Sequence, residues 1–110
     1  MAKNVLIAED TPSWVGILSR GFNRLGIEPD VARSYHEAIK YAKSKHYDLC
    51  VLDSLEGDYV PLRELILSEH PDSRVVLFTG NPIEQGRADS NGIEAYNKPD
   101  DMAKILDLIK

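Results

Sequence analysis

Acidic side chains follow two apolar runs of this sequence, in positions that suit joint binding of a cation. Glu9 and Asp10 come directly after residues 4–8, and Asp53 comes directly after residues 48–52. If both runs are neighbouring strands, their carboxylates converge at one edge of a sheet. Carboxylates a few ångström apart repel one another, and a hard divalent cation with oxygen ligands relieves that repulsion. The pattern therefore predicts a metal site, and Mg²⁺ is the expected ion.

A hydroxyl and an ammonium follow two later apolar runs. Thr79-Gly80 comes after residues 75–78, and Lys98-Pro99 comes after residues 93–97. An ammonium stabilises negative charge on a reacting group electrostatically, without covalent work. Because proline disfavours helical geometry at the residue before it, Lys98 is expected in extended backbone, from which its side chain reaches back over the sheet's edge.

Short apolar runs without alternation predict the sheet that positions these side chains. Such runs suit parallel strands covered on both faces, and sites in open parallel sheets form at the carboxyl ends of the strands. Strands that alternate with helices imply an α/β fold with right-handed crossovers and helices on both faces. The strands are expected at residues 4–8, 28–32, 48–52, 75–78 and 93–97.

Helix signals fill the stretches between the strands. Ser34 and Glu37 have the spacing of a capping box, and the hydroxyl of Thr11 stands where it caps a helix. Residues 81–92 contain few apolar side chains, so any helix there is short and weakly held. The other helices are expected from Thr11 to Gly26, from Ser34 through Ala42, up to His70-Pro71, and over residues 100–110.

Length and composition predict one domain spanning residues 1–110, of the 110 in the chain. No apolar stretch approaches the about 20 residues of a membrane helix, and the first residues lack a secretory signal, so a cytoplasmic location without membrane contact is expected. The net charge of −5, with scattered basic residues, argues against direct nucleic-acid binding. Cys50 lies in an apolar run and is expected to be a buried, unreactive thiol.

The ordered set of motifs closely resembles the receiver domain of two-component response regulators, in particular a single-domain receiver of the chemotaxis kind. An acidic pair after the first strand, Asp after the third, Thr-Gly after the fourth and Lys-Pro after the fifth follow the family's order, and the resemblance covers essentially the whole chain. It implies a flavodoxin-like three-layer sandwich, in which a five-stranded parallel sheet has the strand order 2-1-3-4-5. It also implies a phosphorelay signalling domain rather than an enzyme, with at most self-phosphorylation from a donor and autodephosphorylation.

The resemblance assigns a role to each motif residue. Asp53 matches the aspartate that takes a phosphoryl group from a sensor histidine kinase or a phosphotransfer protein. Phosphorylation then changes how the domain binds a downstream protein, whose identity is unknown. Thr79 matches the hydroxyl that bonds a phosphoryl oxygen. Lys98 matches the lysine that pairs with the phosphoryl group, and the Lys-Pro peptide is commonly cis in the family. The implied Mg²⁺ ligands are Glu9 through water, Asp10, Asp53 and the backbone carbonyl of Leu55.

Two loops depart from the family pattern. The loop after Asp53 is shorter than usual, and its extra acids, Glu56 and Asp58, would disfavour an anionic donor or alter dephosphorylation. The stretch between Thr79 and Lys98 is also short, which should trim the fourth helix that many receivers use for partner contacts.

The family's switch aromatic lies three places before the lysine, where this chain has Ala95, with Tyr96 beside it. Neighbouring positions on a regular strand point to opposite faces. Either the strand carries an irregularity that restores Tyr96, or the coupling between the threonine and an aromatic is missing. We favour the irregularity.

Two other functions stay open. The first is a receiver-like interaction module that keeps the fold and is not phosphorylated in use. The second, a hydrolase with Asp53 as nucleophile, is disfavoured because Leu55 stands where the dehalogenase type has an aspartate.

Other side chains capable of chemistry are expected to be structural. Trp14 and Phe22 are most simply core contacts of the first helix, with a position of Trp14 near the acids as the alternative. His36, His46 and His70 have no metal-ligand spacing and are expected at the surface.

Overall fold

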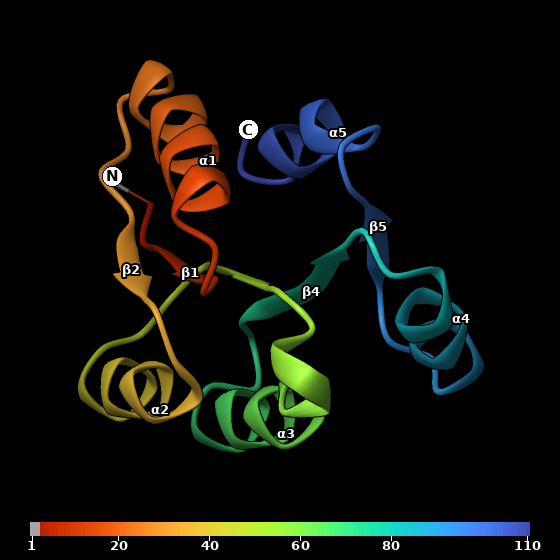
Figure 1. The fold of residues 1–110 in the computed structure, drawn as a ribbon. Coiled ribbons are helices and arrows are strands. Elements are labelled where there is room, and N and C mark those ends of the chain that lie inside the picture. The colour runs from red at the N-terminus through yellow and green to blue at the C-terminus, as the bar shows by residue number, and fades with distance from the viewer. Residues whose placement is uncertain (1–2) are drawn as a thin grey trace.

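A single parallel sheet positions every motif described above. The computed structural model describes residues 3–110 and contains five strands in the order β2-β1-β3-β4-β5 (Figure 1). This order confirms the predicted flavodoxin-like architecture. The strands are β1 (Val5–Ala8), β2 (Asp30–Ala32), β3 (Leu49–Leu52), β4 (Arg74–Thr79) and β5 (Ala95–Asn97). The helices are α1 (Pro12–Arg24), α2 (Tyr35–Ser44), α3 (Tyr59–Glu69), α4 (Pro82–Ser90) and α5 (Met102–Asp107), with a 3₁₀ turn, η1 (Leu55–Gly57), before α3.

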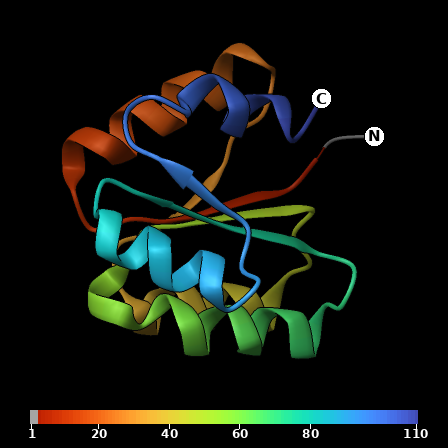
Figure 2. The ribbon, with the colours of Figure 1, turned by 90° about the vertical axis from the view of Figure 1, so that its right-hand side faces the viewer.

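Helices cover both faces of the sheet. The helices α1 and α5 lie on one face, and α2, α3 and α4 lie on the other (Figures 1 and 2). Successive residues of β1 enter two separate cores, because Leu6 and Ala8 pack towards α2, α3 and α4, whereas Val5 and Ile7 pack towards α1 and α5. Both faces of the strand are therefore dry, which explains why its sequence is an unbroken apolar run.

Two predicted helix caps differ in detail from the expectation. Thr11 occupies the position before α1, but its side chain makes no capping bond, and the carboxylate of Glu9 instead accepts the backbone N–H of Thr11 at 3.1 Å. At α2 the hydroxyl of Ser34 accepts the N–H of Glu37 at 3.1 Å as predicted. The Glu37 carboxylate accepts from Arg33, one residue earlier than in a regular capping box.

Several elements are shorter than their apolar patterns suggest. Strand β2 starts at Asp30 and strand β5 starts at Ala95, two residues later than expected in each case, and α5 covers only Met102–Asp107. The segment expected to hold a short helix forms α4, which is nine residues long and is capped by the side chain of Asn81. Only Ala88 of α4 is buried, so its attachment to the sheet rests on few apolar contacts.

Not every apolar residue of the α1 segment is buried. Ile17 and Leu25 share the helical spacing of the apolar stripe on α1, yet both are exposed, because the stripe narrows to Leu18 and Phe22 against the sheet. Cys50 is buried as expected, and burial raises the pKa of its thiol to about 12. None of the helices within residues 3–110 is long and apolar enough to span a bilayer.

Candidate functional site

The three acidic motif residues converge at the carboxyl ends of two neighbouring strands. Strands β1 and β3 pair in parallel with Ala8 opposite Leu52, so Glu9 and Asp53 leave the sheet side by side. One carboxylate oxygen from each of Glu9, Asp10 and Asp53 lies within 4.8 Å of the others. Within residues 3–110, no other group of His, Cys, Asp or Glu side chains comes together in this way.

The ammonium of Lys98 reaches this cluster from the end of β5. Its Nζ atom donates to Oδ1 of Asp53 at 3.0 Å and also to Oε1 of Glu9. Only 9% of the Lys98 side chain is exposed, so the ion pairs are shielded from water. The Lys98-Pro99 peptide is cis, and the backbone N–H of Lys98 donates to the carbonyl of Thr79 at 2.9 Å. These bonds anchor the lysine beside the end of β4.

Glu9 is the most enclosed member of the cluster, with 1% of its surface exposed. Burial raises the pKa of its carboxyl, the Lys98 ammonium partly opposes this rise, and the negative charge of Asp53 adds to it. One ammonium faces three carboxylates, so negative charge is in excess. Hard oxygen donors with uncompensated charge suit a divalent cation such as Mg²⁺.

The loop after Asp53 turns back tightly through η1. Leu55 and Glu56 adopt left-handed backbone, with φ of 49° and 56°. The N–H of Leu55 points to Oδ2 of Asp53 at 3.5 Å, and the Leu55 carbonyl accepts the N–H of Asp58 at 3.0 Å. Because a carbonyl oxygen has two lone pairs, this bond leaves one for the metal role expected of Leu55, which stays a prediction.

Thr79 is the last residue of β4, and only 2% of its surface is exposed to solvent. Its Oγ1 atom accepts the backbone N–H of Asn81 at 3.1 Å. That bond uses a lone pair and leaves the hydroxyl proton to donate elsewhere.

A small cavity of about 190 Å³ opens beside Asp10. Its walls include Glu56 and Asp58, so the extra acids noted in the sequence lie next to the cluster. Arg33 and Tyr35, which sequence reasoning did not single out, also line it.

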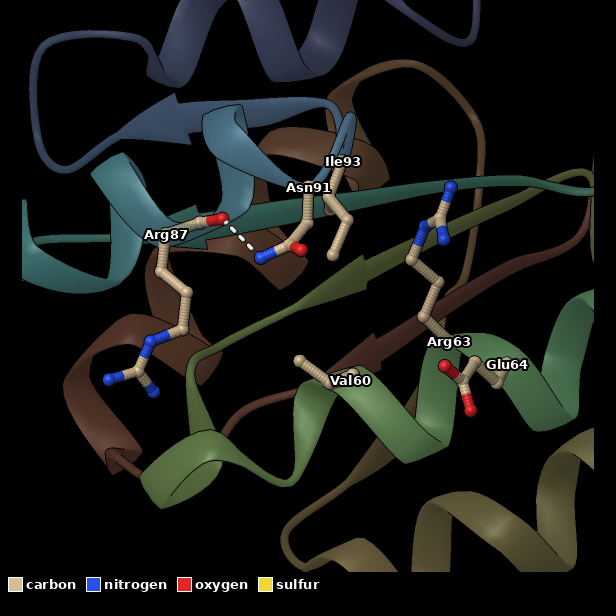
Figure 3. A pocket seen from close by; sticks show the side chains of 6 residues that line it. All are labelled: Val60, Arg63, Glu64, Arg87, Asn91 and Ile93. Atoms are coloured by element: carbon tan, nitrogen blue, oxygen red, sulfur yellow. Dashed lines mark hydrogen bonds between the residues drawn. The ribbon is translucent and has the colours of Figure 1, made fainter.

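A larger cavity of about 340 Å³ lies between α3 and the α4–β5 segment (Figure 3). Across it Arg63 extends from α3 towards the sheet, while the side-chain amide of Asn91 donates to the carbonyl of Arg87 at 2.8 Å. The cavity contains none of the motif residues, so its size does not mark the chemical site. Its lining residues are Val60, Arg63, Glu64, Arg87, Asn91 and Ile93.

Solved structures share this fold and extend over nearly the whole chain. The receiver domain of NtrC4 from Aquifex aeolicus is 29% identical, with a TM-score of 0.77, over 97% of this chain and 93% of that one. A response regulator from Burkholderia pseudomallei, solved with a phosphorylated aspartic acid, a calcium ion and citrate, is 26% identical, with a TM-score of 0.80, over 98% of this chain and 66% of that one. The chain is a response regulator receiver domain.

A further structure shows the same fold at lower identity. Response regulator TrrA from Thermotoga maritima, solved in complex with Mg²⁺-BeF, is 23% identical, with a TM-score of 0.82, over 97% of this chain and 96% of that one. No protein-family model matches the sequence, and no curated protein matches it. The fold and the order of the motifs thus carry the family assignment.

Trp14 packs against the core under α1 and α5 as expected, and its ring also lies beside the site lysine, which was the alternative position. The Trp14 ring centroid lies 5.1 Å from Nζ of Lys98, and the Phe78 centroid lies 5.7 Å from it. The one available signal in the sequence is that Trp14 falls in the first turn after the acidic pair.

The favoured irregularity at the switch position is not found in β5, and that expectation is wrong. Strands β4 and β5 pair in regular register, with Leu77 opposite Ala95 and Phe78 opposite Tyr96. Ala95 packs with the core under α2, α3 and α4, whereas Tyr96 packs with the core under α1 and α5. The face that carries the aromatic switch in the family therefore carries a methyl group in this receiver.

Proposed function

We propose that this receiver accepts a phosphoryl group on Asp53 from the phosphohistidine of a sensor histidine kinase or a phosphotransfer protein, and thereby changes its affinity for a downstream protein. The observation that carries the proposal is the convergence of Asp53 with two further carboxylates and the Lys98 ammonium at one strand edge. Residues 1–110 form one receiver domain in this proposal. The transfer of the phosphoryl group takes place in the cytoplasm.

The transfer makes one bond and breaks one. A carboxylate oxygen of Asp53 attacks phosphorus, so an O–P bond forms while the P–N bond to the donor imidazole breaks. The imidazole leaves with the electron pair of that bond. Because its other ring nitrogen carries a proton, the product is neutral histidine. Asp53 is 16% exposed at its side chain, which gives a donor access from one side.

Lys98 and Thr79 stabilise the charge that the phosphoryl group brings. The Lys98 ammonium already lies 3.0 Å from an Asp53 oxygen, so it meets the new phosphoryl oxygens with little movement. The hydroxyl proton of Thr79 is free to donate to one of them, because its bond with Asn81 uses only a lone pair.

The donor set of Glu9, Asp10 and Asp53 fits Mg²⁺, with the Leu55 carbonyl as a further candidate ligand. When bound, Mg²⁺ would neutralise carboxylate charge and the charge on the phosphoryl oxygens. Asp10 is the exposed member of the three, so it is the carboxylate best placed for exchange of the ion with solvent.

Mass spectrometry of the intact protein tests the proposal. Incubation with acetyl phosphate and Mg²⁺ is expected to add the mass of one phosphoryl group, and Asp53→Asn is expected to remove that addition. An addition of the same size in Asp53→Asn would refute Asp53 as the acceptor.

One observation favours the alternative of an interaction module that is not phosphorylated in use. Ala95 replaces the switch aromatic, so the family's route from phosphorylation to surface change lacks its aromatic in this chain. Titration of Trp14 fluorescence with Mg²⁺, with and without beryllofluoride, separates the two functions. A response to beryllofluoride supports the phosphoacceptor, and none supports the module.

A further inference from the structure

The Lys98 ammonium contacts two carboxylates and two aromatic rings. It donates to Glu9 and Asp53, and it lies over the rings of Trp14 and Phe78, whose centroids are 5.1 and 5.7 Å from Nζ. Both distances are within the range of cation–π attraction, which strengthens when water is excluded. The 9% exposure of the Lys98 side chain meets that condition.

The two rings hold each other in place. Trp14 and Phe78 pack edge to face, with centroids 5.5 Å apart and planes at 84°. Phe78 is fixed in β4 and is 1% exposed, whereas Trp14 comes from the first turn of α1 and is partly buried. The pair therefore joins a strand of the sheet to the helix that follows the acidic pair.

This arrangement restricts where the lysine can go. A lysine side chain has a flexible four-carbon stem, and its ammonium is strongly hydrated, so an unconfined lysine at a strand end spends much of its time in water. Attraction to the two rings favours the positions in which Nζ stays close to them, and in those positions it is also 3.0 Å from an Asp53 oxygen. A phosphoryl group on Asp53 then finds the ammonium already in place, and less conformational entropy is lost when the pair forms.

We propose that Trp14, supported by Phe78, is a positioning residue that holds the Lys98 ammonium ready for the phosphoryl group. The inference rests on the proposed function of Asp53. It assigns to Trp14 a role that a core contact would not have, because Trp14 is expected to affect the binding of a phosphoryl group more than the binding of the metal.

The first experiment compares the two affinities in variants of Trp14. Beryllofluoride binding is measured by ¹⁹F NMR in the presence of Mg²⁺, and Mg²⁺ binding alone is measured by calorimetry. Trp14→Leu keeps an apolar side chain without a ring and is expected to weaken beryllofluoride binding about tenfold, the scale of a desolvated cation–π contact. Its affinity for Mg²⁺ is expected to change less than twofold, on the order of surface-substitution effects. Trp14→Phe keeps a ring and is expected to restore most of the loss.

Phe22→Leu is the matched control. Phe22 lies on the same helix, is fully buried in the same core and has no contact with Lys98 among the described interactions. It is expected to lower stability while leaving beryllofluoride affinity near that of the wild type. Equal losses in Phe22→Leu and Trp14→Leu, or equal losses of beryllofluoride and Mg²⁺ affinity, would overturn the positioning role.

The second experiment needs no phosphoryl group. Because Trp14 is the only tryptophan, its emission reports one ring. Removal of the neighbouring charge in Lys98→Met is expected to shift the emission, whereas Lys40→Met on the surface of α2 is expected to leave it unchanged. An unshifted emission in Lys98→Met would refute the contact.

Failure of the proposed function gives a different result. In that case the wild-type protein itself takes no label on Asp53 and binds no beryllofluoride, which overturns both proposals together. Normal labelling of the wild type with unchanged binding in Trp14→Leu overturns the role of Trp14 alone.

Discussion

The ammonium of Lys98 lies 3.0 Å from an oxygen of Asp53, although 45 positions separate the two residues in the sequence. The pair forms because β5 and β3 end at the same edge of the sheet and the lysine side chain spans the end of β4 between them. The same ammonium contacts Glu9, which is almost fully enclosed. Lys98 thus compensates part of the negative charge in the cluster and leaves the rest in excess.

Lys98→Met is expected to lower stability and phosphoryl uptake together. Loss of one partner of a buried ion pair leaves an uncompensated charge at Glu9, which destabilises proteins by about 3 kcal/mol. Urea unfolding measures this change. Mg²⁺ is expected to restore more stability to Lys98→Met than to the wild type, because a cation replaces the missing charge. Equal Mg²⁺ effects in both proteins would contradict this account of the cluster.

Mg²⁺ is expected to raise the melting temperature of the wild-type protein. A ligand that binds only the folded state at a hundred times its Kd stabilises that state by about 2.7 kcal/mol. Asp10→Asn removes one of the three carboxylates and is expected to abolish most of the effect. Asp72→Asn, which changes an acid outside the cluster, serves as the control for general charge effects. Thermal unfolding with and without EDTA provides the measurement.

Much of the fold was predictable from the sequence because the apolar runs coincide with strands that are buried in the structure. The runs that end at Glu9, Asp53 and Thr79 are buried on both faces. A strand buried on both faces has a continuous apolar sequence, so these runs predict strands directly. Convergence of the polar residues then follows from parallel topology alone.

Other features depended on packing that no local pattern encodes. Trp14 has the spacing of a core residue, and only the place of the end of β5 in the sheet shows that its ring meets a lysine 84 residues away in sequence. The backbone of Thr11 is capped by Glu9 because that carboxylate is held between the lysine and the start of α1. The regular register of β5 was also open in the sequence, since Ala95 and Tyr96 each suit a strand.

Tyr96→Phe is expected to leave phosphoryl uptake and the response to beryllofluoride unchanged. The Tyr96 hydroxyl donates to the carboxylate of Glu94 at 2.5 Å, on the face of the sheet away from α4. Its loss removes one hydrogen bond and is expected to lower stability by about 1 kcal/mol. A strongly reduced beryllofluoride response in this variant, followed by ¹⁵N chemical shifts of α4, would mean that Tyr96 does act as the switch aromatic.

Glu56→Gln is expected to speed labelling by acetyl phosphate severalfold at low ionic strength. Glu56 lines the cavity beside Asp10, where its charge opposes the approach of an anionic donor. The gain should shrink as salt screens the exposed charge over about 10 Å. Glu64→Gln on α3, outside that cavity, is the matched control. Initial rates of mass addition at two salt concentrations test the difference, and a rate gain that is insensitive to salt would exclude an electrostatic cause.

Tyr47→Phe is expected to reduce stability at neutral pH and to matter less in acid. The Tyr47 hydroxyl donates to Asp30 at 2.8 Å and the Lys45 ammonium lies 3.1 Å from the same oxygen. Burial acts to raise the pKa of the Asp30 carboxyl, but these two partners outweigh it and hold that pKa below its ordinary value of 3.8.

A carboxyl whose pKa is lowered by folding stabilises the folded state above its unfolded pKa, and this contribution is lost as the pH falls through the folded value. The unfolding free energy of Tyr47→Phe is therefore expected to lie about 1 kcal/mol below that of the wild type at pH 7. The gap should narrow as the pH falls towards the folded pKa of Asp30, which lies below 3.8 in the wild type and rises when the Tyr47 hydrogen bond is lost. Tyr35→Phe, which removes a hydroxyl without a hydrogen bond among residues 3–110, should show no such pH dependence. A gap that stays constant from pH 7 to pH 3 would show that the Tyr47 hydroxyl stabilises the protein independently of the Asp30 charge.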